Sequence, residues 1–263
     1  MIDLAATVDG IARLQVPSGM IPWFPGGHCD PWNHVETAMA LSVGGRRREA
    51  EQAYRWLADV QNRDGSWFNY YIGDDVEDYR LDTNVIAYVA VGVWHHYLVT
   101  GDRDFAAALW PTVERALDFV VRLQQPRGEV LWCIEPDLNP GRFALLTGSS
   151  SIYLSLRCGV AVGDLVGKQR PDWELAAGRL AHAIAYTPDV FEPKDRWAMD
   201  WYYPVLVGAL PAESGAARLA RGWDRFVLDE GGERGVRCVA DQPWVTTAET
   251  CECALAHLRV GDR

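Results

Sequence analysis

Two kinds of helix alternate along this chain, and that alternation constrains the fold more than any other feature. One kind is apolar on all sides, as in "NVIAYVAVGVW", and the other carries a charged face, as in "RRREAEQAYRWLADVQ". A helix that is apolar on all sides is buried, whereas a helix with a charged face is peripheral. Helical periodicity predicts helices over residues 3–14, 31–43, 46–62, 82–100, 104–124, 146–162, 172–187, 197–209, 213–228 and 245–259. Extended backbone is expected only in short stretches near 129–134 and 235–240.

The turns between the two kinds of helix repeat as well. Gly44, Gly101, Gly163 and Gly261 end the similar segments "LSVG", "LVTG", "VAVG" and "LRVG", where we expect a glycine to end an inner helix in the left-handed conformation. Repeated helical hairpins stack into rings. We therefore predict an all-α fold, a single α/α toroid domain over residues 1–263. The last turn resembles one that precedes an outer helix, so we expect the toroid to be incomplete at its C-terminus.

Charge and cysteine content narrow the functional classes. The 36 acidic and 25 basic residues give a net charge of −11, which argues against a nucleic-acid partner. No apolar run approaches the roughly 20 residues of a membrane span, and the N-terminus lacks a secretory pattern. Six cysteines without a CxxC pair indicate reduced thiols and a cytoplasmic protein. The uncovered apolar side of helix 245–259 would allow a second copy of the chain to pack there as a homodimer.

The loops that lead into the inner helices concentrate the candidate functional residues. In a toroid, the loops 22–33, 64–84, 132–150, 193–203 and 240–250 would surround one cleft. Flat aromatic side chains suit stacking on sugar rings or isoprenoid chains, and the alternative is that they only pack at helix junctions. The candidate substrate contacts are Trp32, His34, Trp67, Tyr70, Asp82, Trp132, Asp137, Asp200, Trp201, Tyr202 and Trp244.

Two carboxylates stand out as candidates for acid–base chemistry. Asp30 precedes Pro31, so it is a natural N-cap, but it also lies at the expected mouth of the cleft. Superposing the repeats makes Glu36 and Glu252 equivalent, which favours a packing role for both. Glu249 lies one turn nearer the mouth and breaks this symmetry, so it is the better catalytic candidate.

Metal and cofactor motifs are weak. The segment "DDVED" at 74–78 fits the magnesium–diphosphate motif of isoprenoid enzymes, but that motif needs a helix, and the segment follows Gly73 in an expected loop. The adjacent residues His28, Cys29 and Asp30 cannot converge on one ion without further ligands. No P-loop, GxGxxG or HExxH is present. We expect neither a metal nor a cofactor.

Longer stretches resemble a known superfamily. "DPWNHVETAMAL" and "QNRDGSW" are similar to the helical toroids of terpenoid cyclases, prenyltransferase β-subunits and inverting glycoside hydrolases. The cyclase acid motif DxDD is missing, and the prenyltransferase zinc set is not reproduced. "WFPGGHCDPWNHVETAMAL", "DTNVIAYVAVGVW" and "WAMDWYYPVLVGAL" are closer to the mycobacterial hydrolases of methylmannose polysaccharides. That resemblance implies endo-acting, inverting, metal-independent cleavage of a cytoplasmic α-1,4-linked mannan.

An inverting glycosidase needs an acid and a base about 6.5–9.5 Å apart. We assign Asp30 as the acid, since Trp23 and Trp32 would desolvate it, and Glu249 as the base. Asp82, Asp137 and Asp200 are alternatives. The rival functions are an isoprenoid cyclase or prenyltransferase and a carbohydrate-binding toroid without catalysis.

Overall fold

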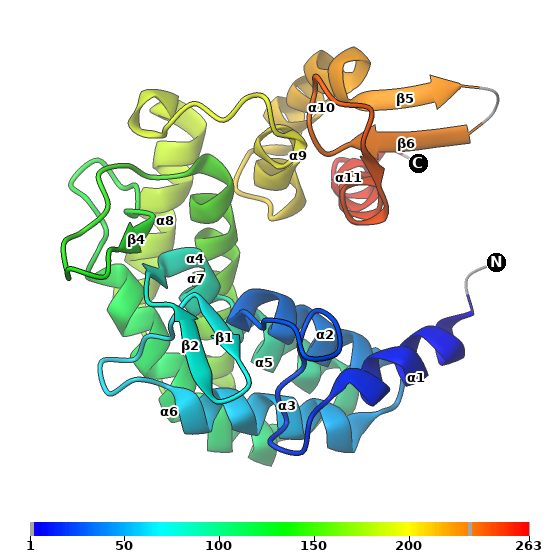
Figure 1. Ribbon diagram of the computed structural model, residues 1–263. Coiled ribbons are helices and arrows are strands. Elements are labelled where there is room, and N and C mark those ends of the chain that lie inside the picture. The colour runs from blue at the N-terminus through cyan, green and yellow to red at the C-terminus, as the bar shows by residue number, and fades with distance from the viewer. Residues whose placement is uncertain (1–2, 231–232, 263) are drawn as a thin grey trace.

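The computed structural model describes residues 3–230 and 233–262. Helices dominate it (Figure 1). They are α1 (Leu4–Leu14), α2 (Pro31–Val43), α3 (Arg47–Val60), α4 (Thr83–Ala87), α5 (Val89–Thr100), α6 (Arg103–Val121), α7 (Leu146–Val166), α8 (Pro171–Tyr186), α9 (Ala198–Leu206), α10 (Ala212–Phe226) and α11 (Thr247–Arg259), with a 3₁₀ turn at Pro188–Val190.

The helices form two layers that follow an arc. The inner layer runs through α2, α4 and α5, α7, α9 and α11, and each of these packs against the next. The outer helices α3, α6, α8 and α10 cover them from outside. The ends of the arc, α1 and α11, lie on either side of an opening (Figure 1). This arrangement confirms the predicted all-α toroid of inner and outer helices.

Burial explains why the two layers differ in sequence. On α2, Val35, Ala38 and Leu41 are fully buried, and α5 buries residues on every side of its first two turns. The inner helices can approach closely because small residues line them. A Cβ on Gly92 of α5 would lie 2.5 Å from a methyl group of Val35 and 2.8 Å from the ring of Tyr54. Only glycine fits between these two elements without displacing them.

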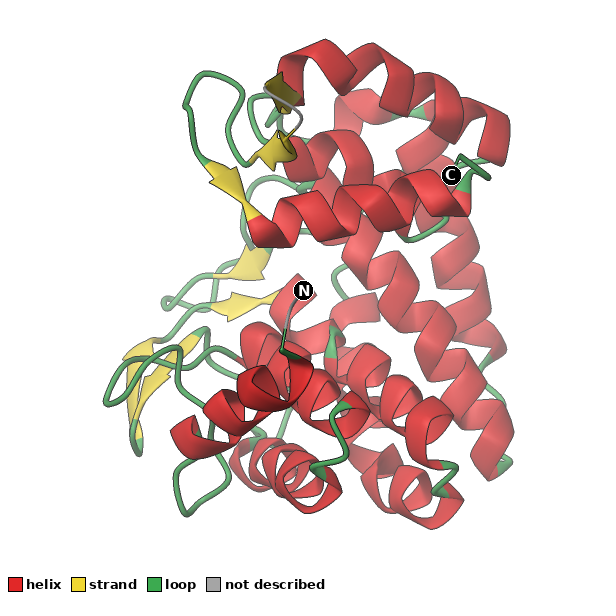
Figure 2. Ribbon diagram, turned by 90° about the vertical axis from the view of Figure 1, so that its right-hand side faces the viewer, coloured by secondary structure: helices red, strands yellow, loops and turns green. Residues whose placement is uncertain are grey.

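Short strands and most long loops gather at one end of the helices (Figure 2). All the pairings are antiparallel: β1 with β2, β3 with β4, and β5, β6 and β7 in one sheet. The strands are β1 (Tyr70–Ile72), β2 (Asp75–Asp78), β3 (Leu81–Asp82), β4 (Cys133–Ile134), β5 (Val227–Glu230), β6 (Glu233–Arg237) and β7 (Val245–Thr246). The extended stretches expected near 129–134 and 235–240 are confirmed. The hairpin β1–β2 was expected as a loop, and its strand β2 contains most of "DDVED", which therefore lacks the helix that the diphosphate motif needs.

Several predicted details of the helices are wrong. The helix expected over 82–100 is interrupted at Tyr88, where an i+3 hydrogen bond from the Val91 N–H to the Tyr88 carbonyl tightens the turn. Gly163 does not end α7 but lies inside it, where a Cβ would lie 2.5 Å from the carbonyl oxygen of Lys168 and 3.1 Å from the ring of Trp110. The helix ends instead at Gly167, with φ 75°.

The other glycine turns follow the prediction in part. Gly101 ends α5 in the left-handed conformation with φ 69°. Gly261 is also left-handed with φ 84°, one residue beyond the cap of α11 at Val260. After α2, the left-handed residue is Gly45 with φ 76° rather than Gly44.

Candidate active site

Asp30 begins the first inner helix and is 4% exposed. One carboxylate oxygen, Oδ1, accepts the backbone N–H of Asn33 at 2.9 Å, as an N-cap does. The other, Oδ2, accepts the indole N–H of Trp23 at 2.7 Å and the side-chain amide of Asn33 at 2.9 Å. The carboxylate is therefore both a helix cap and a fixed group at the mouth of α2.

Asp82 repeats this arrangement at the start of α4. Its Oδ1 accepts the backbone N–H groups of Asn84 and Val85, and its Oδ2 accepts the indole N–H of Trp132 at 2.6 Å. Burial raises the pKa of Asp82 to about 6, an effect that its hydrogen bonds oppose and the charge of Asp30 reinforces. A carboxyl group with such a pKa can hold or release a proton near neutral pH.

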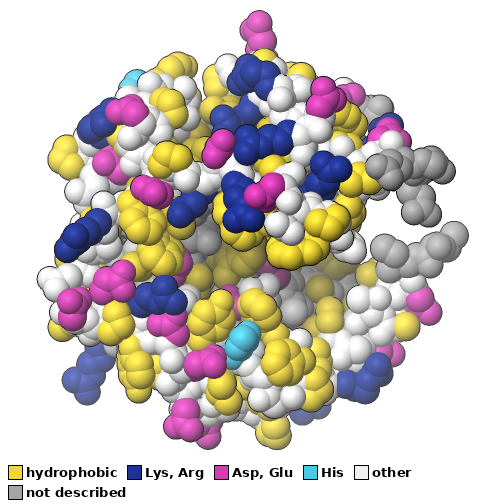
Figure 3. Space-filling model, turned by 45° about the horizontal axis from the view of Figure 1, so that its top comes forward, with side chains coloured by type: hydrophobic (Ala, Val, Ile, Leu, Met, Phe, Trp, Pro, Cys, Tyr) yellow, Lys and Arg dark blue, Asp and Glu magenta, His cyan; other side chains and the backbone are white. Residues whose placement is uncertain are grey.

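A cavity of about 200 Å³ lies beside Asp82. Three polar atoms of its lining residues are buried without a hydrogen-bond partner: the indole N–H of Trp32, the amide oxygen of Asn84 and the hydroxyl of Ser151. Buried polar groups are normally paired, so unpaired ones in a cavity indicate a place for a polar ligand. Figure 3 shows one face of the molecule with a hollow near its centre and hydrophobic side chains around the hollow. The complete lining is Trp32, Asp82, Asn84, Trp132, Leu145, Thr147, Gly148, Ser151, Met199 and Tyr203.

The candidate base lies on α11, which stands across the arc from α2 (Figure 1). Glu249 occupies the first turn of α11 and accepts the hydroxyl of Thr246. One turn further on, Glu252 accepts the hydroxyl of Tyr202. The pKa of Glu252 is raised to about 7, mainly by burial and also by the charges of Glu36 and Glu249, while the hydrogen bond from Tyr202 opposes the shift.

Glu36 matches Glu252 on the other side, as the repeat predicts. It accepts the hydroxyl of Tyr88, and burial raises its pKa. The charge of Glu36 reaches Glu252, and both carboxyls raise the pKa of Tyr203, which lines the cavity. The inner helices thus hold buried glutamates and tyrosines around the centre of the arc.

Four of the predicted sugar contacts are buried in the core. Trp67 donates its indole N–H to the carbonyl of Leu57 at 2.9 Å, and Tyr202 is fully buried beneath Glu252. His34 accepts the N–H of Ile21 through Nδ1 at 3.2 Å, and burial lowers its pKa to about 4. Trp201 turns away from the cavity and lines a second pocket. The first three side chains have no exposed face for a sugar and Trp201 faces another pocket, so we leave all four out of the proposed site.

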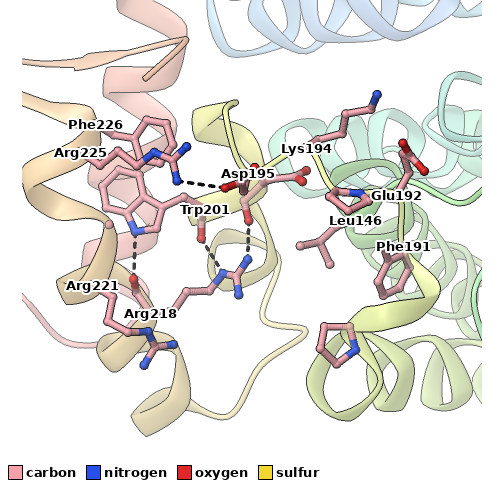
Figure 4. A pocket seen from close by; sticks show the side chains of 14 residues that line it. Leu146, Phe191, Glu192, Lys194, Asp195, Trp201, Arg218, Arg221, Arg225 and Phe226 are labelled. Atoms are coloured by element: carbon pink, nitrogen blue, oxygen red, sulfur yellow. Dashed lines mark hydrogen bonds and ion pairs between the residues drawn. The ribbon is translucent and has the colours of Figure 1, made fainter. Parts of the chain in front are cut away.

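Trp201 lines a second pocket, of about 350 Å³, between α10 and the segment before α9 (Figure 4). Its ring stacks on Phe226 at 5.3 Å, and its indole N–H bonds to the carbonyl of Arg218 at 3.0 Å. The guanidinium of Arg218 donates to the backbone carbonyls of Asp200 and Trp201. Asp200 accepts the hydroxyl of Thr147, so it joins this pocket to the central cavity, and burial raises its pKa.

Three further predicted contacts lie outside the cavity: Tyr70, Trp244 and Asp137. Tyr70 is half-buried on β1, and burial together with the charges of Asp30 and Asp82 raises its pKa, so its hydroxyl lies near both carboxyls. Trp244 is largely exposed in the loop before β7. Asp137 lies exposed in a turn, where it accepts both the backbone and side-chain N–H groups of Asn139. Asp137 therefore organises its own loop.

The adjacent His28, Cys29 and Asp30 side chains point to different partners. His28 approaches Glu77 at 3.4 Å, whereas Cys29 is buried and its thiol pKa is raised by burial. Within residues 3–230 and 233–262, no three His, Cys, Asp or Glu side chains are grouped to hold a metal ion.

Sequence reasoning missed several residues of this site. Asn84 and Ser151 supply two of the unpaired cavity atoms, and Asn33 holds the Asp30 carboxylate. Trp23 was expected beside Asp30, and its indole N–H donates to that carboxylate. Ser151 lies in the small-residue start "TGSSS" of α7, which marks a helix that others approach closely. No pattern distinguishes Asn84 from a residue of the first helical turn without a ligand.

The chain is similar in sequence to two proteins named as hydrolases of sugars. An MMP endo-(1,4)-3-O-methyl-α-D-mannosidase from Mycolicibacterium hassiacum is 52% identical over 258 residues, covering 97% of this chain and 70% of the relative. The chain belongs to this endomannosidase family. The resemblance to hydrolases of methylmannose polysaccharides is thereby confirmed, and the endomannosidase family is one of glycoside hydrolases. An uncharacterized glycosyl hydrolase from Methanocaldococcus jannaschii is 28% identical over 152 residues, 56% of this chain and 24% of that protein.

Solved structures share the fold of this chain. A family 63 mannosylglycerate hydrolase from Thermus thermophilus superposes with a TM-score of 0.72 at 12% identity, covering 98% of this chain and 87% of that one. A rhamnosidase from Klebsiella oxytoca gives 0.62 at 12% identity, covering 99% of this chain and 52% of its own. No family model matches the chain. In the part of this chain that the structure describes, no helix is both long and apolar enough to cross a membrane.

Proposed function

We propose that this chain is an endo-acting hydrolase of an α-1,4-linked methylmannose polysaccharide. The observation that carries the proposal is its 52% identity, over nearly all of its length, to an endomannosidase named for that bond and that methylated sugar. The cavity beside Asp82, with its unpaired donor and acceptor atoms, supports a sugar as the ligand.

The catalytic pair we propose is Asp30 as acid and Glu249 as base. In an inverting reaction, Glu249 removes a proton from a water molecule while the oxygen of that water forms a bond to the anomeric carbon. Asp30 gives a proton to the glycosidic oxygen as the bond between that oxygen and the anomeric carbon breaks. One face of the sugar is attacked while the leaving group departs from the other, so the product has the opposite anomeric configuration. Trp23 and Asn33 hold the Asp30 carboxylate in place for this role.

Asp82 is the rival for the acid, because it lines the cavity and its pKa is raised to about 6. We propose that it instead binds a sugar hydroxyl. Glu252 is the corresponding neighbour of Glu249, and we propose that it supports the packing of α9 and α11 through Tyr202. The proposal can therefore be tested with matched pairs of substitutions.

The test is hydrolysis of a methylated α-1,4-mannooligosaccharide, with product masses and NMR of the newly formed anomeric centre. Asp30→Asn and Glu249→Gln should each lower kcat by more than about 1,000-fold, whereas Asp82→Asn and Glu252→Gln should lower it by less than about 100-fold. Circular dichroism would show that each variant is folded. A larger loss in Asp82→Asn or Glu252→Gln than in its partner would transfer the catalytic role, and a retained anomeric configuration would refute inversion.

Two rival functions give different results in the same assay. An isoprenoid cyclase or prenyltransferase would need Mg²⁺ or Zn²⁺, so EDTA would abolish its activity. The hydrolysis that we propose needs no metal, and we expect it to survive EDTA. A toroid that binds carbohydrate without catalysis would release no product at all.

Location and assembly complete the proposal. We propose that the enzyme acts in the cytoplasm, since all six cysteines are free thiols in the structure. Leu255 and Leu258 of α11 are largely exposed, and we propose this side as the contact with a second copy. Sedimentation of the purified chain as a monomer at all concentrations would refute the dimer.

A further inference from the structure

An aromatic rim stands beside the proposed acid, and the mechanism uses only the indole N–H of one of its rings, Trp23. We define this rim as Trp23, Phe24, His28 and Tyr70. The Trp23 side chain is 50% exposed and Phe24 is 54% exposed. The rings of Trp23, Phe24 and Tyr70 all lie against the ring of His28. The centroid of the His28 ring is 4.7 Å from that of Trp23, 5.0 Å from that of Tyr70 and 6.0 Å from that of Phe24. Exposed aromatic clusters of this kind mark binding surfaces.

The backbone under the rim is fixed. The Trp23 N–H donates to the His28 carbonyl at 2.9 Å, and the Gly27 N–H donates to the Phe24 carbonyl at the same distance. A Cβ on Gly27 would lie 2.6 Å from the Phe24 ring, so the ring rests directly on the glycine backbone. Just after the rim, Cys29 and Tyr71 exchange two backbone hydrogen bonds of 2.8 Å. The exposed rings therefore belong to a closed, internally bonded turn, and a ligand would meet them already in place.

The rim is continuous with the proposed catalytic site. The indole N–H of Trp23 bonds to Asp30, so one edge of this ring touches the carboxylate while much of the side chain stays exposed. Tyr70 extends the rim onto β1, with its ring centroid 5.0 Å from that of His28 and 6.3 Å from that of Trp23. A sugar unit bound next to the one being cleaved would lie against these rings.

We propose that the aromatic rim is a subsite that selects O-methylated sugars over unmethylated ones. This inference rests on the proposed function and assigns its substrate preference to named residues. A methyl ether adds apolar surface and removes a donor, and the exposed surface of Trp23 and Phe24 offers apolar contact without requiring that donor. Burying one methyl group corresponds to about a fourfold gain in affinity. The part of the preference that the rim supplies is therefore of this order for each methyl group that it covers.

The test compares methylated and unmethylated α-1,4-mannooligosaccharides of one length. Phe24→Ala should lower the ratio of their kcat/KM values about fourfold, and Trp23→Phe should lower kcat for both substrates because it removes the donor to Asp30. Tyr186→Ala is the matched control, since it removes an exposed ring from the end of the outer helix α8. That variant should leave the ratio unchanged.

Calorimetry separates this inference from the proposed function. The Kd values of methyl 3-O-methyl-α-mannoside and methyl α-mannoside can be compared whether or not the chain cleaves a polysaccharide. A preference for the methylated glycoside that Phe24→Ala abolishes supports the subsite even if no hydrolysis is found. Equal losses for both sugars, or a ratio that Phe24→Ala leaves unchanged, would overturn it.

Discussion

Replacing Asp82 with asparagine tests whether the charge of a site residue lowers the stability of the folded chain. The carboxyl of Asp82 has a pKa of about 6 in the folded chain against an ordinary 3.8. The folded chain therefore binds this proton more tightly than the unfolded chain does. The resulting stabilisation is fully present below about pH 3.8 and is lost as the pH rises through about 6. At 1.36 kcal/mol per pKa unit, the ionised carboxylate costs the folded state up to about 3 kcal/mol above pH 6.

Asparagine removes the charge of Asp82 but keeps only one of its two acceptor oxygens. Its side-chain oxygen can still cap α4, whereas the amide nitrogen that replaces the second oxygen cannot accept the indole N–H of Trp132. Relative to the wild type, Asp82→Asn should therefore gain up to about 3 kcal/mol between pH 4 and pH 8, starting from a stability at pH 4 that the lost indole hydrogen bond lowers by about 1–3 kcal/mol. Urea unfolding at several pH values measures the difference, with an unchanged slope showing that the compactness of the two end states is the same.

A second capping aspartate provides the control with the opposite sign. Asp102 caps the outer helix α6, and its pKa is lowered, first by the N–H of Phe105 and then by Arg47. Its stabilisation is present at neutral pH and is lost as the pH falls. Asp102→Asn should therefore lower stability at pH 7, with a difference that shrinks in acid. An Asp82→Asn variant whose stability relative to the wild type does not rise between pH 4 and pH 8 would refute the reasoning.

Other substitutions probe the packing of the inner layer. Gly92→Ala forces a methyl group against Val35 and should lower the free energy of unfolding by about 1–3 kcal/mol, whereas Gly178→Ala on α8, with open space around it, should raise it by about 0.5–1 kcal/mol; equal effects in thermal unfolding would contradict the close approach. Tyr202→Phe removes the hydrogen bond that opposes the shift at Glu252, so the pKa of Glu252 should rise above about 7 and stability at pH 8 should fall by about 1–3 kcal/mol. Carboxyl NMR titration checks the pKa, and an unchanged or lower value would argue against a direct contact.

Periodicity alone predicted the two layers of helices, because burial on all sides leaves a clear mark on α5 and α7. The repeat also paired Glu36 with Glu252, and both accept a tyrosine hydroxyl in the structure. Which way a side chain points near a helix start was not predictable. Trp132 and Trp201 both lie at a loop near an inner helix, yet only Trp132 lines the cavity. Their orientation depends on partners far away in the chain, which a single sequence does not specify.

The pattern of unpaired atoms was beyond sequence reasoning for the same reason. Asn84 follows its cap as many helix residues do, and only the shape of the cavity leaves its amide oxygen without a donor. The sequence could also not separate a capping aspartate from a catalytic one. Asp30 caps α2 by accepting the backbone N–H of Asn33. That bond and the one from the Trp23 indole N–H also fix its position in the site.

Because Asp30 and Asp82 each occupy the first position before an inner helix, the spacing between them is set by how α2 and α4 pack. The loops that precede them can change in length and composition without moving either carboxylate, provided that Trp23 and Trp132 still reach them. Evolution can therefore reshape the rim, and with it the sugars that are accepted, while the distance between these charges stays constant. The ring of helices fixes the spacing of the two carboxylates, and the loops that lead into the helices can vary around them.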